Sequence, residues 1–307
     1  MFRKGSVDKS LFKRFLLIAI PIIIQNGITN FVSLLDNIMV GQVGSVQMSG
    51  VSIVNGLLFV FNLCVFGASS GAGIFTAQFY GSHDHEGIRY TFRFKLLICS
   101  VLSILGIGIF CAVGMPLISL YLQGEGDAAE AAQVLHYGLN YLRVMLWGLV
   151  PFALCNAYAS TLRETGQTTV PMVAGVVAVF INLILNYVLI FGHFGAPKLG
   201  VEGAAVATVI SRYVQVAYVV IWTHTHTEKM PFIVRIYRKW TIPLSLVGKI
   251  SLKGAPLLAN EVMWAAGVAF LNQCYSVRGL DVVAAMNIAT TLNIWYNATR
   301  KEMCRLW

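Results

Sequence analysis

The chain has 307 residues, of which 57% are hydrophobic and only 11% are charged. A soluble protein carries about 25% charged residues, so the composition excludes a soluble globular domain and indicates a polytopic membrane protein. The net charge of +9 does not indicate nucleic-acid binding, because the basic residues are divided among alternate connections between apolar segments. The six cysteines are scattered, without a C-x-x-C pair, and predict neither a metal site nor a disulfide framework. The sequence contains no Ser/His/Asp constellation, so we do not expect an enzyme.

Apolar segments recur along most of the sequence. A membrane-spanning helix needs about 20 mostly apolar residues, and this criterion predicts seven spans and the start of an eighth. We place them at 14–38, 52–78, 94–120, 136–161, 169–192, 203–223 and 250–275, with a stub from 282. The predicted fold class is therefore an all-α polytopic membrane protein.

The connections between the predicted spans alternate in charge. Lys and Arg are concentrated in the N-terminus, after the second span and in the long 224–249 loop, whereas the connection after the third span is acidic. The positive-inside rule then predicts a multi-pass protein of the cytoplasmic (inner) membrane with its N-terminus in the cytoplasm. Because the long loop also contains Tyr237 and Trp240, we expect it to lie along the membrane surface.

The first predicted span carries a carboxylate, Asp36, near its far end. A charge within the hydrocarbon is costly, so it suggests a functional site; the alternative is that Asp36 lies in water at the interface. Within the membrane Asp36 would be suited to exchange one proton or to hold one monovalent cation, since burial disfavours an isolated charge. Pro21 is a candidate hinge, and Gln25 and Asn26 are candidate substrate or coupling residues.

Polar side chains also occur in the fifth and sixth predicted spans. Asn182 and Asn186 are four residues apart and share a helix face. Their amide oxygens could complete a cation site, although Asn in a span also commonly bonds neighbouring helices. Thr208 could add a hydroxyl, whereas Ala204 fits close helix packing. Arg212 is unusual within a span and needs a partner or a water-filled cavity.

The seventh predicted span carries a second carboxylate, Glu261, shortly after Pro256. Pro256 frees a backbone carbonyl and is a second candidate hinge. Glu261 is either a substrate or coupling residue or an acid near the membrane interface. A shift of 235 residues aligns Pro21 with Pro256 and Asn26 with Glu261, which suggests a parallel repeat of two like halves.

Taken together, these motifs resemble the multidrug and toxic compound extrusion (MATE) family. The resemblance is carried by Asp-Asn-Ile-Met-Val-Gly-Gln-Val-Gly at 36–44, Tyr-Ala-Ser-Thr-Leu-Arg-Glu-Thr-Gly-Gln at 158–167, the two asparagines of the fifth span, and Gly-Ala-Ala-x-Ala-Thr-x-Ile-Ser-Arg at 203–212. It implies two six-helix lobes around a central cavity, and cation-coupled antiport of drugs or organic cations. The implied coupling ion is H+ or Na+, with no other cofactor or metal.

The resemblance also implies roles for particular residues. The implied cation site consists of Asp36, Asn182, Asn186, Ala204 and Thr208. Glu261 matches an acid that some members use for cation coupling or substrate binding. The implied partners are the lipid bilayer and small organic cations or drugs, and the full-length protein would be a monomer that binds no nucleic acid.

Domain boundaries follow from the same resemblance, which implies twelve spans in a full member. Residues 1–225 would form a six-helix N-lobe, 226–249 a cytoplasmic inter-lobe loop, and 250–292 the start of a C-lobe with the seventh span and part of an eighth. The tail at 293–307 is polar where the family continues apolar, so we expect a truncated chain. Two alternatives remain: a flippase for a lipid-linked precursor, which would need a basic, lipid-sized cavity, and a non-transporting membrane fragment.

Overall fold

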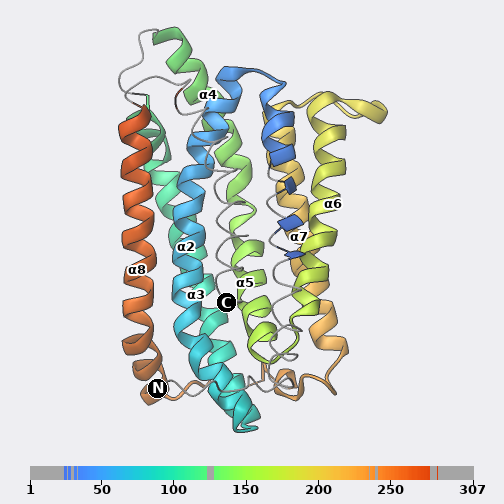
Figure 1. Ribbon diagram of the computed structural model, residues 1–307, viewed down its shortest axis with the longest axis vertical. Coiled ribbons are helices and arrows are strands. Elements are labelled where there is room, and N and C mark those ends of the chain that lie inside the picture. The colour runs from blue at the N-terminus through green and yellow to red at the C-terminus, as the bar shows by residue number, and fades with distance from the viewer. Residues whose placement is uncertain are drawn as a thin grey trace, which may run out of the picture.

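The structure is a computed structural model, and it describes residues 24–25, 27–28, 31–32, 34–122, 128–234, 236–238, 241–276 and 282. Long helices run side by side along one axis of the molecule (Figure 1). Residues 34–41 are helical and precede the first labelled helix. The labelled helices are α2 (Ser45–Gly81), α3 (His85–Leu120), α4 (Ala128–Leu146), α5 (Leu149–Glu164), α6 (Thr169–Phe191), α7 (Val201–Thr225) and α8 (Leu244–Ser276), with short 3-10 turns η1 (His193–Gly195) and η2 (Pro231–Ile233).

The described helices have the length and composition of membrane spans. Five of them, α2, α3, α6, α7 and α8, are long and apolar enough to cross a membrane, and α4 with α5 can form a sixth, bent span. These correspond to the second to seventh predicted spans. The first predicted span lies only partly within the described residues, and the eighth and the 293–307 tail lie outside them, apart from Val282.

The fourth predicted span, 136–161, is broken between α4 and α5, whose axes differ by 48°. Pro151 explains the break, because proline cannot donate a backbone hydrogen bond and its ring clashes with the carbonyl one turn earlier. Arg212 of α7 braces this point: its Nη1 donates to the Gly148 carbonyl oxygen at 3.2 Å, and its guanidinium lies 5.1 Å from the centre of the Phe152 ring. The fourth predicted span is therefore a bent pair of helices, which can still form one span.

Helix α2 is at the centre of the described helix bundle and packs against α3, α4, α5 and α8. Its contact with α8 is close, since a Cβ added at Gly71 would lie 2.5 Å from the Gly254 Cα. Small residues allow such approach and favour helix association in membranes. Helices α6 and α7 form the other closely packed pair, on the opposite side of the bundle from α8 (Figure 1). Pro256 does not interrupt α8, which is continuous from Leu244 to Ser276.

The connection between α7 and α8 packs several apolar side chains against the ends of helices. Phe232, Ile233 and Ile236 are buried, with 1% to 3% of each residue exposed. Arg93 of α3 donates through Nε to the Ile236 carbonyl oxygen at 2.8 Å, and the Phe92 and Phe232 rings meet edge to face. The loop sequence alone does not reveal that its apolar side chains lie between helix ends, and its expected place along the membrane surface stays a prediction.

Candidate cation site

Asp36 lies in the helical segment 34–41 and faces α6. The Asn186 side-chain Nδ2 donates a hydrogen bond to Asp36 Oδ1 at 2.6 Å. Asn186 is almost fully buried, with 1% of the residue exposed, whereas Asp36 is half-buried. The contact joins residues that are 150 positions apart. It places Asp36 inside the helix bundle rather than in water beyond the end of its helix.

Asn182 lies one turn before Asn186 on α6 and reaches the same carboxylate. The positions of the nitrogen and the oxygen in an Asn side-chain amide are assigned from their hydrogen-bond partners. In the orientation that satisfies both ends, the nitrogen lies 3.0 Å from Asp36 Oδ2 and the oxygen lies 3.3 Å from Thr208 Oγ1. Both asparagines therefore present an N–H to the carboxylate of Asp36.

Helix α7 completes the cluster with a hydroxyl and a backbone carbonyl. Thr208 Oγ1 donates to the Ala204 carbonyl oxygen at 3.0 Å, and Ala204 is 5% exposed. The Asn186 Oδ1 atom is buried and has no hydrogen-bond partner within the described structure. Buried polar atoms usually have a partner, so this oxygen is available to a bound ion or water. The five residues expected to form a cation site lie in one cluster.

The cluster contains one formal charge and several oxygen atoms. Among the described residues, the only ion pair is between Lys95 and Glu164, so no basic side chain there neutralises Asp36. Carboxylate, amide, hydroxyl and carbonyl oxygens are the ligands that a hard cation such as Na+ prefers. A proton on the Asp36 carboxyl would neutralise the charge equally well. The donor set thus fits either ion, and its chemistry does not choose between them.

The other predicted site residues lie elsewhere or outside the described part. Glu261 lies against α2, where a Cβ added at Gly67 would be 3.3 Å from its Cβ. Gln25 packs against α6, with its Nε2 2.8 Å from the position of a Cβ at Gly175. Arg212 contacts the α4–α5 break, as described above. Asn26 and the predicted hinge Pro21 lie outside the described residues.

A second buried charged group was not predicted. Lys95 of α3 is completely buried and forms an ion pair with Glu164 of α5, whose side chain is 19% exposed. The Lys95 ammonium also donates to Ser160 Oγ at 3.2 Å and Thr161 Oγ1 at 3.3 Å. The α5 residues lie within the 158–167 motif, but the sequence does not indicate that α3 supplies their partner.

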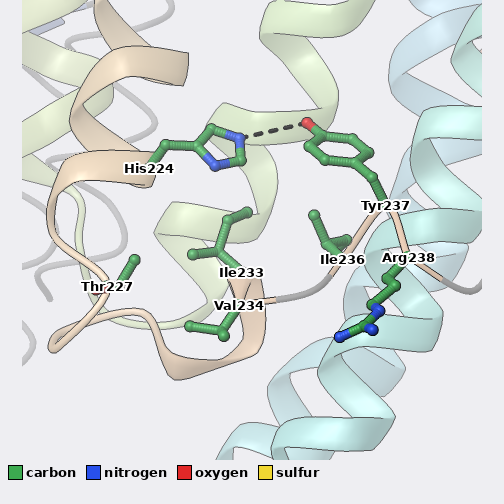
Figure 2. Close-up of a pocket in the computed structure, with 7 residues that line it drawn as sticks. All are labelled: His224, Thr227, Ile233, Val234, Ile236, Tyr237 and Arg238. Atoms are coloured by element: carbon green, nitrogen blue, oxygen red, sulfur yellow. Dashed lines mark hydrogen bonds between the residues drawn. The ribbon is translucent and has the colours of Figure 1, made fainter.

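A surface pocket of about 560 Å³ lies at the end of the helix bundle where the α7–α8 connection docks. Figure 2 shows Tyr237 and His224 facing each other across it, with the Tyr237 hydroxyl 3.3 Å from His224 Nε2. The Tyr158 hydroxyl also contacts the Tyr237 hydroxyl. None of the pocket-lining residues belongs to the Asp36 cluster, so this pocket is separate from the candidate cation site.

The fold and the polar cluster between its helices define a polytopic membrane protein of transporter type, and comparison with known proteins gives the family. The MatE family model matches residues 21–188, more than half of the chain. The chain therefore belongs to the MATE family.

Several relatives share this assignment. A probable multidrug resistance protein NorM from Thermotoga maritima is 27% identical over 283 residues, which cover 90% of this chain and 57% of the relative. The probable multidrug resistance protein YoeA from Bacillus subtilis is 28% identical over 259 residues, 83% of this chain and 54% of the relative. The chain thus spans a little over half the length of these relatives.

Solved structures show the same fold. An inward-facing conformation of a multidrug resistance MATE family transporter superimposes with a TM-score of 0.73 at 20% identity, covering 93% of this chain and 64% of that one. An outward-facing conformation of such a transporter gives 0.72, also at 20% identity, with 94% and 64% covered. The all-α polytopic fold class is confirmed.

Proposed function

We propose that this chain is part of a cation-coupled antiporter that exports drugs or organic cations across the cytoplasmic membrane. The observation that carries the proposal is the Asp36 cluster: one half-buried carboxylate, contacted by two asparagines and without a basic partner in the described structure. Relatives that are named multidrug resistance proteins support drug export as the reaction. The alternating basic connections support a cytoplasmic N-terminus.

The cluster would couple the two movements through its charge. A proton or Na+ on Asp36 neutralises a carboxylate that is otherwise solvated by two neutral amides. The N–H groups that point at the carboxylate then lose part of their attraction, because hydrogen bonds to a charged acceptor are stronger than those to a neutral one. The helical segment 34–41 is held to α6 by these bonds, so occupancy of the site would alter how this segment packs. A ligand shifts a conformational equilibrium only if it binds the two conformations of the protein with different affinities. The change in hydrogen bonding at Asp36 would provide such a difference in affinity.

A lipid-linked precursor flippase is the weaker alternative. It would need a basic cavity of lipid size, whereas the cluster between α6, α7 and residues 34–41 is acidic and amide in character. Arg212, the basic residue on α7, is engaged by the Gly148 carbonyl and the Phe152 ring.

Export of a cationic dye from membrane vesicles that contain the full chain tests the proposal. We expect export driven by a proton or Na+ gradient in the wild type, and loss of the gradient-dependent component in Asp36→Asn. Asp84→Asn is the matched control, because Asp84 caps α3 from an exposed position and Asn caps helices equally well. Wild-type export no greater than in vesicles without the protein, or undiminished export in Asp36→Asn, would overturn the proposal.

A further inference from the structure

The pocket beside the α7–α8 connection has walls that the helix bundle holds in place. The connection lies across the end of the bundle (Figure 1). Arg89, near the start of α3, donates through Nε to the Phe232 carbonyl oxygen at 3.1 Å, and Arg93, one turn later, donates to the Ile236 carbonyl oxygen. The side chains of Ile233 and Ile236 are buried and form part of the pocket wall. The pocket is therefore formed by backbone that is anchored to α3.

The lining of this pocket combines polar and aliphatic side chains. Figure 2 shows the His224 ring facing Tyr237, and the Arg238 guanidinium apart from both. The remaining lining residues are one with a hydroxyl and three aliphatic ones: Thr227, Ile233, Val234 and Ile236. Such a surface suits a ligand in which a compact polar group is joined to apolar carbon atoms.

The charge of the pocket is positive and is not neutralised by the protein. Arg238 is exposed, and among the described residues it has no ion-pair or hydrogen-bond partner. The described lining includes no Asp or Glu, and Glu228 of the same connection is exposed outside it. The sequence of the connection adds Lys229, Arg235 and Lys239. An anionic group would find a charge-assisted partner here, whereas an organic cation would find no carboxylate.

The pocket lies at the end of a helix that can span the membrane. His224 belongs to the last turn of α7, which is long and apolar enough to cross a bilayer. Trp222 stacks on His226 at the same helix end, with 4.5 Å between the ring centres, and Trp is enriched at the membrane interface. Four or more Lys and Arg residues directly after a span attract anionic lipids. Phospholipid phosphates are therefore the anions expected beside this pocket.

We propose that this pocket binds the phosphate of an anionic phospholipid, with Arg238 as the charged donor to the phosphate oxygens. A guanidinium can donate two parallel hydrogen bonds to a phosphate. The Thr227 hydroxyl and the His224 ring line the same pocket and can add hydrogen bonds, and Val234 offers an exposed aliphatic contact for the glycerol and the first acyl carbons. The inference goes beyond the proposed function and requires no particular coupling ion.

Lipid bound at Arg238 would fasten the connection to two helices. Tyr237, the preceding residue, contacts the Tyr158 hydroxyl of α5 and lies 3.3 Å from His224 Nε2 of α7. A ligand that binds only the folded protein stabilises it in proportion to its occupancy. The bound phospholipid should therefore strengthen the attachment of the α7–α8 connection to α5 and α7.

Native mass spectrometry of the full chain, delipidated in a neutral detergent, tests the site. We expect phosphatidylglycerol to bind the wild type more tightly than phosphatidylcholine with the same acyl chains. Arg238→Gln should weaken the binding of phosphatidylglycerol at least about tenfold, equivalent to ~1.4 kcal/mol. Arg238→Lys keeps the charge without the paired donors, so its affinity should lie between the two. Because Arg238 is exposed, we expect each variant to keep the circular dichroism of the wild type.

Lys229→Gln is the matched control, because it removes the same charge from the same connection and Lys229 is exposed outside the pocket. It should change the affinity by less than about threefold, since solvent ions screen an exposed charge. Equal losses in Arg238→Gln and Lys229→Gln would overturn the site, because they would show a diffuse attraction to the whole connection. Equal binding of the two lipids, or binding of neither, would also overturn it. Displacement of phosphatidylglycerol by an equal concentration of inorganic phosphate would overturn the assignment to a lipid.

Discussion

Asp36 and Glu164 are partly buried carboxylates in opposite electrostatic settings. Glu164 has a lysine as its partner, and the Lys95 ammonium is fully buried against it. Among the described residues, Asp36 has only neutral partners, with Asn186 Nδ2 2.6 Å from one oxygen and the Asn182 amide 3.0 Å from the other. One site is neutralised by the protein itself, and the other leaves its charge to be neutralised by an ion.

This difference separates two kinds of buried charge. A buried ion pair contributes little net stability, but the loss of one partner is costly because the remaining charge is uncompensated. A carboxylate solvated by amides already lacks a counter-charge, so its removal should cost little in stability and much in ion binding. The following three experiments test this comparison, in order of the expected effect.

Glu164→Gln should have the largest effect on stability. It leaves the Lys95 ammonium buried without its partner, which costs about 3–5 kcal/mol of unfolding free energy. Denaturation of the purified chain in mixed detergent micelles, followed by circular dichroism, measures this change. The double variant Lys95→Met/Glu164→Gln should recover most of the loss. Equal instability in the single and double variants would show that the charges are not the cause.

Asn186→Leu should have an intermediate effect. It removes a hydrogen bond to a charged acceptor, which is worth about 1.5–3 kcal/mol. In an Asp36→Asn background the same change removes only a neutral contact, worth about 0.5–1.5 kcal/mol. The same denaturation experiment, arranged as a double-mutant cycle, measures the difference between the two costs. This difference is the coupling free energy between Asn186 and the Asp36 carboxylate. Identical costs in both backgrounds would mean that Asp36 carries no charge in the folded protein.

Gly73→Ala should have the smallest effect. Its Cβ would meet the Glu164 carboxylate and displace it from Lys95, at a cost of about 1–3 kcal/mol for an overpacked interior. Gly56→Ala on the same helix is the control, because a Cβ there would find nothing within 4 Å; it should stabilise the helix by up to about 1 kcal/mol. Thermal denaturation of the two variants compares them. Equal stability of both would show that Gly73 does not hold the ion pair in place.

Much of the Asp36 cluster could be predicted from the sequence. An acid in an apolar segment is costly wherever the segment packs, so Asp36 was a candidate before its neighbours were known. The four-residue spacing of Asn182 and Asn186 fixes their common face in any helix. Asn55, Asn62, Ser69 and Thr76 of α2 have an equally regular spacing of seven, and this signal could have been found. It was missed because Ser and Thr in a span commonly bond their own backbone and attract no particular interpretation.

The sequence by itself determined which segments are membrane helices and which face of each helix its polar residues occupy, because hydropathy and helical period act within a single segment. Only the tertiary structure decided which faces meet. It paired Lys95 with Glu164 across 69 positions, set Arg212 against the α4–α5 break, and placed apolar side chains of the α7–α8 connection between helix ends. These contacts depend on how several helices pack together, and a local pattern contains no information about the partner that packing will supply.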